Sequence, residues 1–177
     1  MDTRQTIINL LRSTGRKGIE NVISLLENSN FFTVGSHSHH RYVGGTTDHA
    51  LETLMLARRH GRGVDDNSLI ITSLLHDICN IHGYRDIDGH GGRSARILKD
   101  VCHLELTTDE CNAISYHMWK RHKRPVRSKL ELAVFDADKS SAKRYCLQDL
   151  LSFTEIAIKI FLTMCHTLAH TWCNFAV

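Results

Sequence analysis

Apolar residues recur along most of the chain at intervals of three and four positions, which places them on one face of an α-helix. In the helix expected over residues 47–59, this face should contain Leu51, Leu54 and Met55. Residues 30–46, with two phenylalanines and a Gly-Gly pair, are predicted to form a loop. No stretch alternates convincingly as a strand does, so we predict a compact, all-α helical bundle. The predicted helices cover residues 3–13, 18–28, 47–59, 66–78, 92–103, 108–119 and 147–172.

Two helix starts carry a polar signature. Thr107 precedes Glu110 by three positions, and Ser128 stands in the same relation to Glu131. A hydroxyl and a carboxylate at this spacing can each accept the backbone N–H of the other residue, an arrangement called a capping box. The second of these signals begins a further helix, which carries Asp138.

The size and composition indicate a single folded domain. The chain has 177 residues, of which 42% are hydrophobic, with one proline and 11 glycines. It is long enough to bury a substantial core and too apolar for a disordered chain. Because no repeat, low-complexity tract or linker interrupts the pattern, one domain is expected over residues 1–177.

The charge is too small to indicate a nucleic-acid partner by itself. The formal net charge is +3. Five basic residues between positions 120 and 127 could draw in a phosphorylated substrate, or they could belong to a solvated loop between helices, and the sequence does not separate these readings. The sequence also leaves homo-oligomerisation open. The five residues are Lys120, Arg121, Lys123, Arg124 and Arg127.

Six cysteines are scattered without a C-x-x-C pair, so neither a zinc ribbon nor a disulfide scaffold is indicated. The first residues lack the apolar core of a signal peptide. The longest late apolar run, residues 156–164, is interrupted by a lysine and falls well short of the ~20 residues needed to cross a bilayer. The expected setting is therefore the reducing cytoplasm, with no membrane association.

The adjacent pair His76 and Asp77 closes an apolar run over residues 69–75. A charged aspartate after such a run would be costly to bury without a partner. Neighbouring side chains on a helix diverge by about 100°, yet both can reach one cation, or the carboxylate can bridge two. Two ligands leave an ion under-coordinated, and the candidates for the remaining ligands are His49, His90, His117 and Asp138.

The order of these residues resembles the HD-domain superfamily of metal-dependent phosphohydrolases. The resemblance runs from about residue 39 to about residue 142 and implies an HD-like helical bundle. Three motifs carry it: residues 39–45 leading to His49, residues 74–78 around the His-Asp pair, and residues 137–139, an aspartate followed by a lysine. The family's usual Gly-Lys after the central motif is replaced by Cys79 and Asn80.

The resemblance implies a first metal centre with four ligands, namely His49, His76, Asp77 and Asp138. Asp136 lies two positions before Asp138 and points in a different direction on a helix, and the family pattern selects Asp138. A second centre could use His90 and His117, with Asp77 as the bridge. Imidazole and carboxylate ligands suit divalent Mn, Fe, Co, Ni or Zn. One or two ions are expected.

Basic residues near these positions are candidates for binding a phosphate group. Lys139 and either Arg93 or Arg96 could neutralise its non-bridging oxygens, and ordinary surface charge is the competing interpretation. Three further histidines could line the entrance, hydrogen-bond to the metal ligands, or belong to a solvated loop. They are His37, His39 and His40.

The predicted function is a metal-dependent phosphohydrolase or phosphodiesterase that acts on a nucleotide or another phosphoester through metal-activated water. Asp77 and Lys139 are the expected catalytic residues. Two alternatives stay open. Some relatives use a similar histidine-aspartate cage for di-iron oxygenase chemistry, and a catalytically silent binding domain that keeps the fold would suit the replaced Gly-Lys pair.

Overall fold

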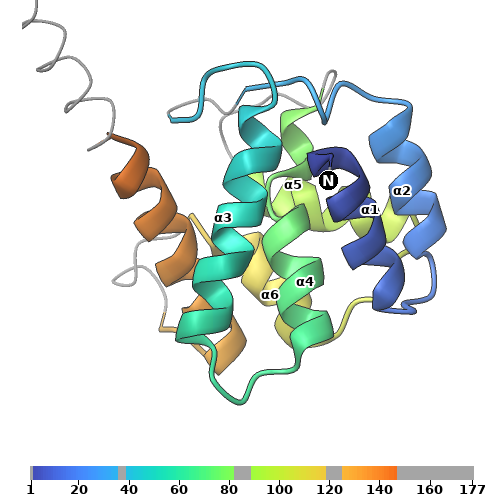
Figure 1. Cartoon of the computed structure of the whole chain (residues 1–177). Helices are drawn as coiled ribbons and strands as arrows, with labels where there is room; N and C mark the ends of the chain where they lie inside the picture. The colour runs from blue at the N-terminus through green and yellow to red at the C-terminus, as the bar shows by residue number, and fades with distance from the viewer. Residues whose placement is uncertain (1, 36–38, 82–88, 119–124, 147–177) are drawn as a thin grey trace, which may run out of the picture. The chain divides into compact units, whose positions relative to one another are not determined.

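The computed structural model describes four stretches of the chain, residues 2–35, 39–81, 89–118 and 125–146. All regular secondary structure within these stretches is helical, which confirms the all-α prediction (Figure 1). The chain divides into two compact units, Met1–Ala142 and Lys143–Val177. The second unit is described only over residues 143–146, so the expectation of a single domain stays a prediction.

The first two helices match their predicted ranges closely. Helix α1 (Thr3–Ser13) and helix α2 (Ile19–Glu27) pack against each other, and α1 also contacts α4. The Asp2 carboxylate caps α1 by accepting the backbone N–H of Arg4. The predicted apolar faces of both helices are buried in the core.

Helix α3 (Gly45–His60) lies beside helix α4 (Asp66–Leu75), as Figure 1 shows. The predicted apolar stripe of α3 is wrong in part, because Met55 is 57% exposed while Leu54 is buried. The buried face instead runs through small and polar residues, among them His49 and Thr53. Apolarity therefore marks only part of the inner face of this helix.

Helix α4 ends at Leu75, three residues earlier than predicted. At this end His76 Nδ1 lies 2.8 Å from the Ser73 carbonyl oxygen, the acceptor that the Asp77 N–H would use if the helix continued. Asp77 leaves helical geometry, with φ −106° and ψ 16°, and a short 3-10 helix, η1 (Ile78–Asn80), follows. The His-Asp pair thus lies at a turn.

The next predicted helix, 92–103, consists of two parts. Helix α5 (His90–Arg96) is followed by a π-helical turn, η2 (Ile97–Val101). Gly91 lets α5 approach helix α6 (Thr108–Tyr116) closely, because a Cβ at this position would collide with the carbonyl oxygens of Ile114 and Ser115. This packing brings the start of α5 to the end of α6.

The first predicted capping box is complete, and the Ser128 half of the second is present. The Thr107 hydroxyl accepts the Glu110 N–H, and the Glu110 carboxylate accepts the Thr107 N–H, so the predicted capping box opens α6. The Ser128 hydroxyl accepts the Glu131 N–H ahead of a helix over residues 129–146.

Several predictions fall on undescribed residues. The predicted helix over 147–172 and four members of the basic cluster, all but Arg127, lie outside the described stretches. Within those stretches, no helix combines the length and apolarity that crossing a membrane requires.

A fully buried carboxylate joins the starts of α4 and α6 to the turn after α1. Glu110 accepts two N–H groups of the Arg16 guanidinium at 2.8 and 2.9 Å, and the Ser68 hydroxyl at 2.7 Å. With the Thr107 N–H, both carboxylate oxygens are hydrogen-bonded. This network fixes three segments that are distant in sequence.

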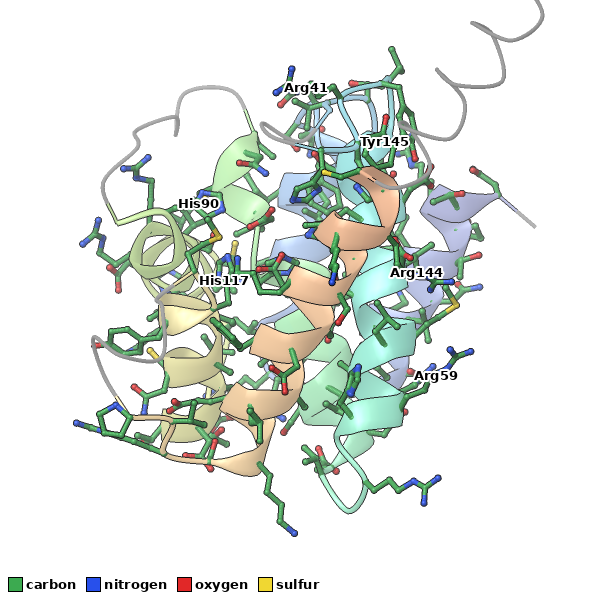
Figure 2. All side chains as sticks on the ribbon, turned by 90° about the vertical axis from the view of Figure 1, so that its left-hand side faces the viewer. Arg41, Arg59, His90, His117, Arg144 and Tyr145 are labelled. Atoms are coloured by element: carbon green, nitrogen blue, oxygen red, sulfur yellow. The ribbon has the colours of Figure 1, made fainter. Side chains whose placement is uncertain are left out.

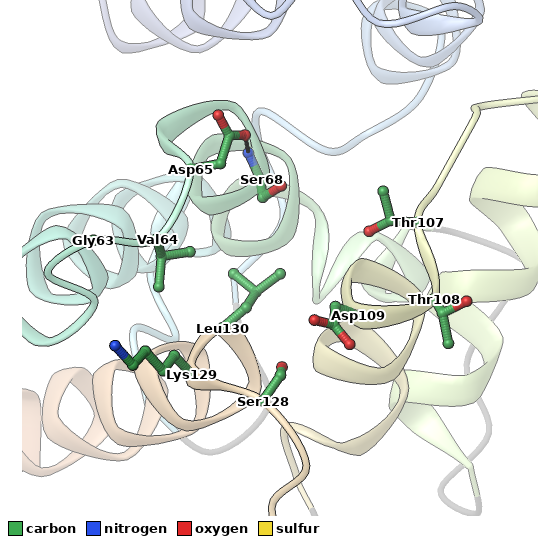
Figure 3. Close-up of a pocket in the computed structure, with 10 residues that line it drawn as sticks. All are labelled: Gly63, Val64, Asp65, Ser68, Thr107, Thr108, Asp109, Ser128, Lys129 and Leu130. Atoms are coloured by element: carbon green, nitrogen blue, oxygen red, sulfur yellow. Dashed lines mark hydrogen bonds between the residues drawn. The ribbon is translucent and has the colours of Figure 1, made fainter.

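A hollow of about 480 Å³ lies beside this network (Figure 3). It is lined by the starts of α4, α6 and the helix 129–146, including Asp65, Asp109 and Lys129. Asp65 caps α4 and Thr107 caps α6, so a backbone N–H group at each of these helix starts is already hydrogen-bonded to a capping side chain. The predicted metal ligands lie at the opposite ends of α4 and α6.

We predict that Glu110→Gln lowers the free energy of unfolding by about 3 kcal/mol, because it leaves the Arg16 guanidinium without its buried counter-charge. Urea denaturation followed by circular dichroism measures the change. Glu20→Gln is the control, since it removes an exposed carboxylate that pairs with Arg12 on the surface and should leave the unfolding midpoint unchanged. Equal midpoints for the two variants would contradict the role given to Glu110.

Candidate metal centre

Six predicted metal ligands come together in one group, which we call the His-Asp cluster. Five of its members are almost completely buried, and His90 is the more exposed one. His90 and His117 face each other from α5 and the end of α6, with ring centroids 5.4 Å apart (Figure 2). The members of the cluster are His49, His76, Asp77, His90, His117 and Asp138.

One side of the cluster joins three helices. His49 Nε2 on α3 lies 3.2 Å from His76 Nε2 at the end of α4 and 3.2 Å from Asp138 Oδ1 on the helix 129–146. The distance from His76 Nε2 to Asp138 Oδ1 is 3.9 Å. These three atoms are close enough to share one metal ion.

The other side of the cluster is centred on one carboxylate oxygen. Asp77 Oδ1 lies 2.6 Å from His90 Nε2, 3.3 Å from His117 Nε2 and 3.6 Å from His76 Nε2. His76, Asp77 and His117 form a second group of potential ligands. Because His76 belongs to both groups, the two sides of the cluster are contiguous.

The backbone orients two of the histidines. His76 Nδ1 lies 2.8 Å from the Ser73 carbonyl oxygen, and His117 Nδ1 lies 2.7 Å from the Ile114 carbonyl oxygen. A carbonyl oxygen can only accept, so each Nδ1 carries the proton and each Nε2 presents a lone pair to the cluster. His117 Nε2 is buried and has no hydrogen-bond partner among the described residues.

The charges in the cluster favour a bound cation. Burial lowers the pKa of His76 to about 4, so this imidazole is neutral at pH 7. Burial acts to raise the pKa values of Asp77 and Asp138, but the surrounding histidines outweigh it and hold both carboxyls well below their usual range. Ionised carboxylates and imidazole nitrogens therefore share a buried space, which fits the ligand chemistry of a divalent transition metal.

His90 differs from the other histidines. Burial lowers its pKa, but the hydrogen bonds to Asp77 and Cys79 outweigh burial and raise the pKa to about 10. Without a metal, a proton on His90 thus compensates part of the Asp77 charge. A metal ion at this position would have to displace that proton.

Two residues that replace the family's Gly-Lys pair contact the cluster. Cys79 Sγ lies 3.0 Å from His90 Nδ1, and the Asn80 side-chain amide donates to Asp77 Oδ2 at 3.3 Å. Both side chains are buried. The replacement therefore puts a thiol and a neutral donor next to cluster residues.

The predicted phosphate-binding residues are placed less uniformly. Lys139 Nζ lies 2.8 Å from Asp138 Oδ2, and its side chain is 43% exposed, so this cation stands at the rim of the cluster. Arg93 is half-buried on α5, three residues after His90. Arg96 is exposed on the same helix, and within the described stretches no hydrogen bond or ion pair joins it to the cluster.

The histidines before α3 lie close to the cluster. The ring centroid of His39 is 4.5 Å from that of His49, and His40 is buried, with its Nδ1 3.0 Å from His39 Nδ1. His40 can pack here because Gly45, where a Cβ would collide with the His40 carbonyl, begins α3. His37 lies outside the described residues.

Sequence reasoning missed two residues beside the cluster. Ser141 Oγ lies 3.0 Å from His49 Nδ1 and donates to the Glu52 carboxylate at 2.8 Å. A signal for them exists, because Glu52 and Ser141 each follow a cluster residue, His49 and Asp138, by three positions on a helix. Residues at this spacing lie on the same helix face.

The comparisons with known proteins agree with this arrangement. A protein-family model described as HD domain matches residues 46–143, which is more than half of the chain and contains all six residues of the His-Asp cluster. No curated protein and no solved structure gave a significant match.

We predict that Asp138→Asn lowers metal affinity at least tenfold more than Asp136→Asn. Asp138 is buried with Oδ1 facing two imidazoles, whereas Asp136 is only half-buried, and loss of a directly bound carboxylate costs more than loss of a neighbour. Titration of the metal-free protein with Mn or Zn measures both affinities. A larger loss of metal affinity in the Asp136 variant would show that the assignment of Asp138 as the last ligand is wrong.

Proposed function

Because this chain belongs to the HD-domain family, a family that generally consists of metal-dependent hydrolases, we propose that it is a metal-dependent phosphohydrolase or phosphodiesterase. The proposed substrate is a nucleotide or another phosphoester. The observation that carries the proposal is the buried His-Asp cluster, in which imidazole lone pairs and ionised carboxylates converge from several helices. Such a donor set suits a divalent cation and has no comparable use in a packed core.

The proposed ligand assignment follows the two sides of the cluster. A first divalent ion would be held by His49, His76, Asp77 and Asp138. A second ion would add His90 and His117, with Asp77 shared, and the short distances from Asp77 Oδ1 to the histidine nitrogens support this bridging role. When bound, the ions would supply an activated water and neutralise charge on the phosphoryl group. The suitable ions are Mn, Fe, Co, Ni and Zn.

The chain's own residues would bind and orient the substrate. Lys139 is proposed to neutralise a phosphate oxygen, because its ammonium group lies at the exposed rim of the cluster and is held there by Asp138. Asp77 is proposed as catalytic because its carboxylate stays ionised and its Oδ2 accepts a hydrogen bond from the Asn80 amide, which orients it. Arg93 and Arg96 on α5 are proposed as further phosphate contacts.

The function is tested by loading the purified chain with Mn under anaerobic conditions and offering a panel of nucleotides and other phosphoesters. We expect cleavage of at least one phosphoester, and its loss in His76→Ala with helical content retained, because this variant removes the ligand that both sides of the cluster share. His60→Ala is the control, since His60 is exposed at the far end of α3.

Two other outcomes would replace the proposal. Oxygen consumption by the Fe-loaded protein without phosphoester cleavage would identify an oxygenase. Stable metal binding with neither activity would identify a binding domain that keeps the fold.

The number of ions gives a separate prediction. His90→Ala or His117→Ala should each remove about one metal ion per chain and leave the other, because neither histidine belongs to the first centre. Elemental analysis and anomalous scattering on the metal-replete protein count the ions. A single ion in the unaltered protein, with an occupancy that neither substitution changes, would rule out the two-ion arrangement.

A further inference from the structure

We infer that Glu52 and Ser141 are positioning residues that fix the tautomer of His49 and thereby point its Nε2 lone pair into the first metal centre. The inference rests on the proposed metal site. It adds two side chains that bind no metal and contact no substrate. They act on the cluster through His49.

The hydrogen-bond directions follow from the chemistry of the three groups. The Glu52 carboxylate can only accept, and its Oε2 lies 2.8 Å from Ser141 Oγ. The single hydroxyl proton of Ser141 is therefore used on Glu52. Ser141 Oγ must then accept at its other contact, the 3.0 Å contact with His49 Nδ1. His49 Nδ1 is consequently the donor in this contact and carries a proton.

This tautomer is the one that metal binding requires. With the proton on Nδ1, His49 Nε2 presents a lone pair between His76 Nε2 and Asp138 Oδ1, each 3.2 Å away. A proton on Nε2 would instead donate to Asp138 and occupy the direction in which a cation must bind. Groups that hydrogen-bond the far nitrogen of a ligand histidine fix both its tautomer and its ring orientation.

His49 depends on side chains in a way that His76 and His117 do not. Those two histidines donate Nδ1–H to a backbone carbonyl of their own helix, which a substitution does not remove. His49 Nδ1 instead reaches across to the helix 129–146. Its orientation is therefore set by two side chains from two helices, and each can be replaced.

Ser141 is held by burial and Glu52 by its polar contacts. Ser141 is fully buried, so no solvent competes for its hydroxyl. Glu52 is on α3, one turn after His49, and its Oε2 also lies 3.5 Å from the Nε2 of the buried His40. The carboxylate thus lies between Ser141 and His40, which connects the segment before α3 to the cluster.

The test reads the tautomer of His49 in the full-length, metal-free protein by nitrogen-15 NMR of the imidazole rings. We expect the Nδ1–H form in the unaltered chain and in the hydroxyl-retaining variant Ser141→Thr. Ser141→Ala should lose it, because no acceptor remains at Nδ1. Glu52→Gln should weaken it, because an amide can donate to Ser141 and turn the hydroxyl proton toward His49. Ser140→Ala, a half-buried neighbour, is the control.

Titration with Co(II), read from its visible absorption, gives the second measurement. Ser141→Ala should weaken binding at the first centre about 10- to 100-fold. The double variant with Glu52→Gln should be no weaker than Ser141→Ala alone, since the inferred effect of Glu52 on the His49 tautomer passes through Ser141. An Nε2–H form in the unaltered protein overturns the inference even if a variant fails to fold. So does an unchanged tautomer and Co(II) affinity in Ser141→Ala.

Neither measurement uses a phosphoester. A chain that shows the expected tautomer and affinities but cleaves no phosphoester would support the inference and overturn only the proposed function. A chain that cleaves a phosphoester but carries the Nε2–H form would do the reverse.

Discussion

Two helices of this protein end at a histidine whose side chain reaches back to the carbonyl group that the next turn would use. His76 does so at the end of α4 and His117 at the end of α6, each through Nδ1. The same bond selects the tautomer and leaves the Nε2 lone pair within the cluster. Since α4 packs against α6, the two rings meet with centroids 4.7 Å apart. The other cluster residues assemble around this pair.

Much of the fold could be predicted from the sequence, because apolar spacing and capping signals are local. The capping box at Thr107 and the limits of α1 needed no tertiary information. The end of α4 was placed too late, because the sequence pattern continues through His76 while the backbone leaves helical geometry at Asp77. The inner face of α3 was misread at Met55, since part of that face is polar and serves the cluster.

The residues of the candidate site could also be predicted only in part. The order of histidines and aspartates gave the cluster members through the resemblance to HD domains, and the match to the family model agrees with it. Glu52 and Ser141 could not be found so easily, because their contact joins positions 89 residues apart and only the folded chain brings them together. The contact between Cys79 and His90 could not be predicted from the sequence either, because it depends on how α5 packs.

The burial of so many electron donors in one place has a thermodynamic consequence. Ionised carboxylates in a buried space oppose the compact state, and without a metal the proton on His90 compensates only part of their charge. An ion that binds only the native chain stabilises it by mass action, by about 2.7 kcal/mol when its free concentration is a hundred times the Kd. The share of folded molecules would then follow the supply of free metal, so that a shortage of the ion lowers the amount of protein as well as the occupancy of its site.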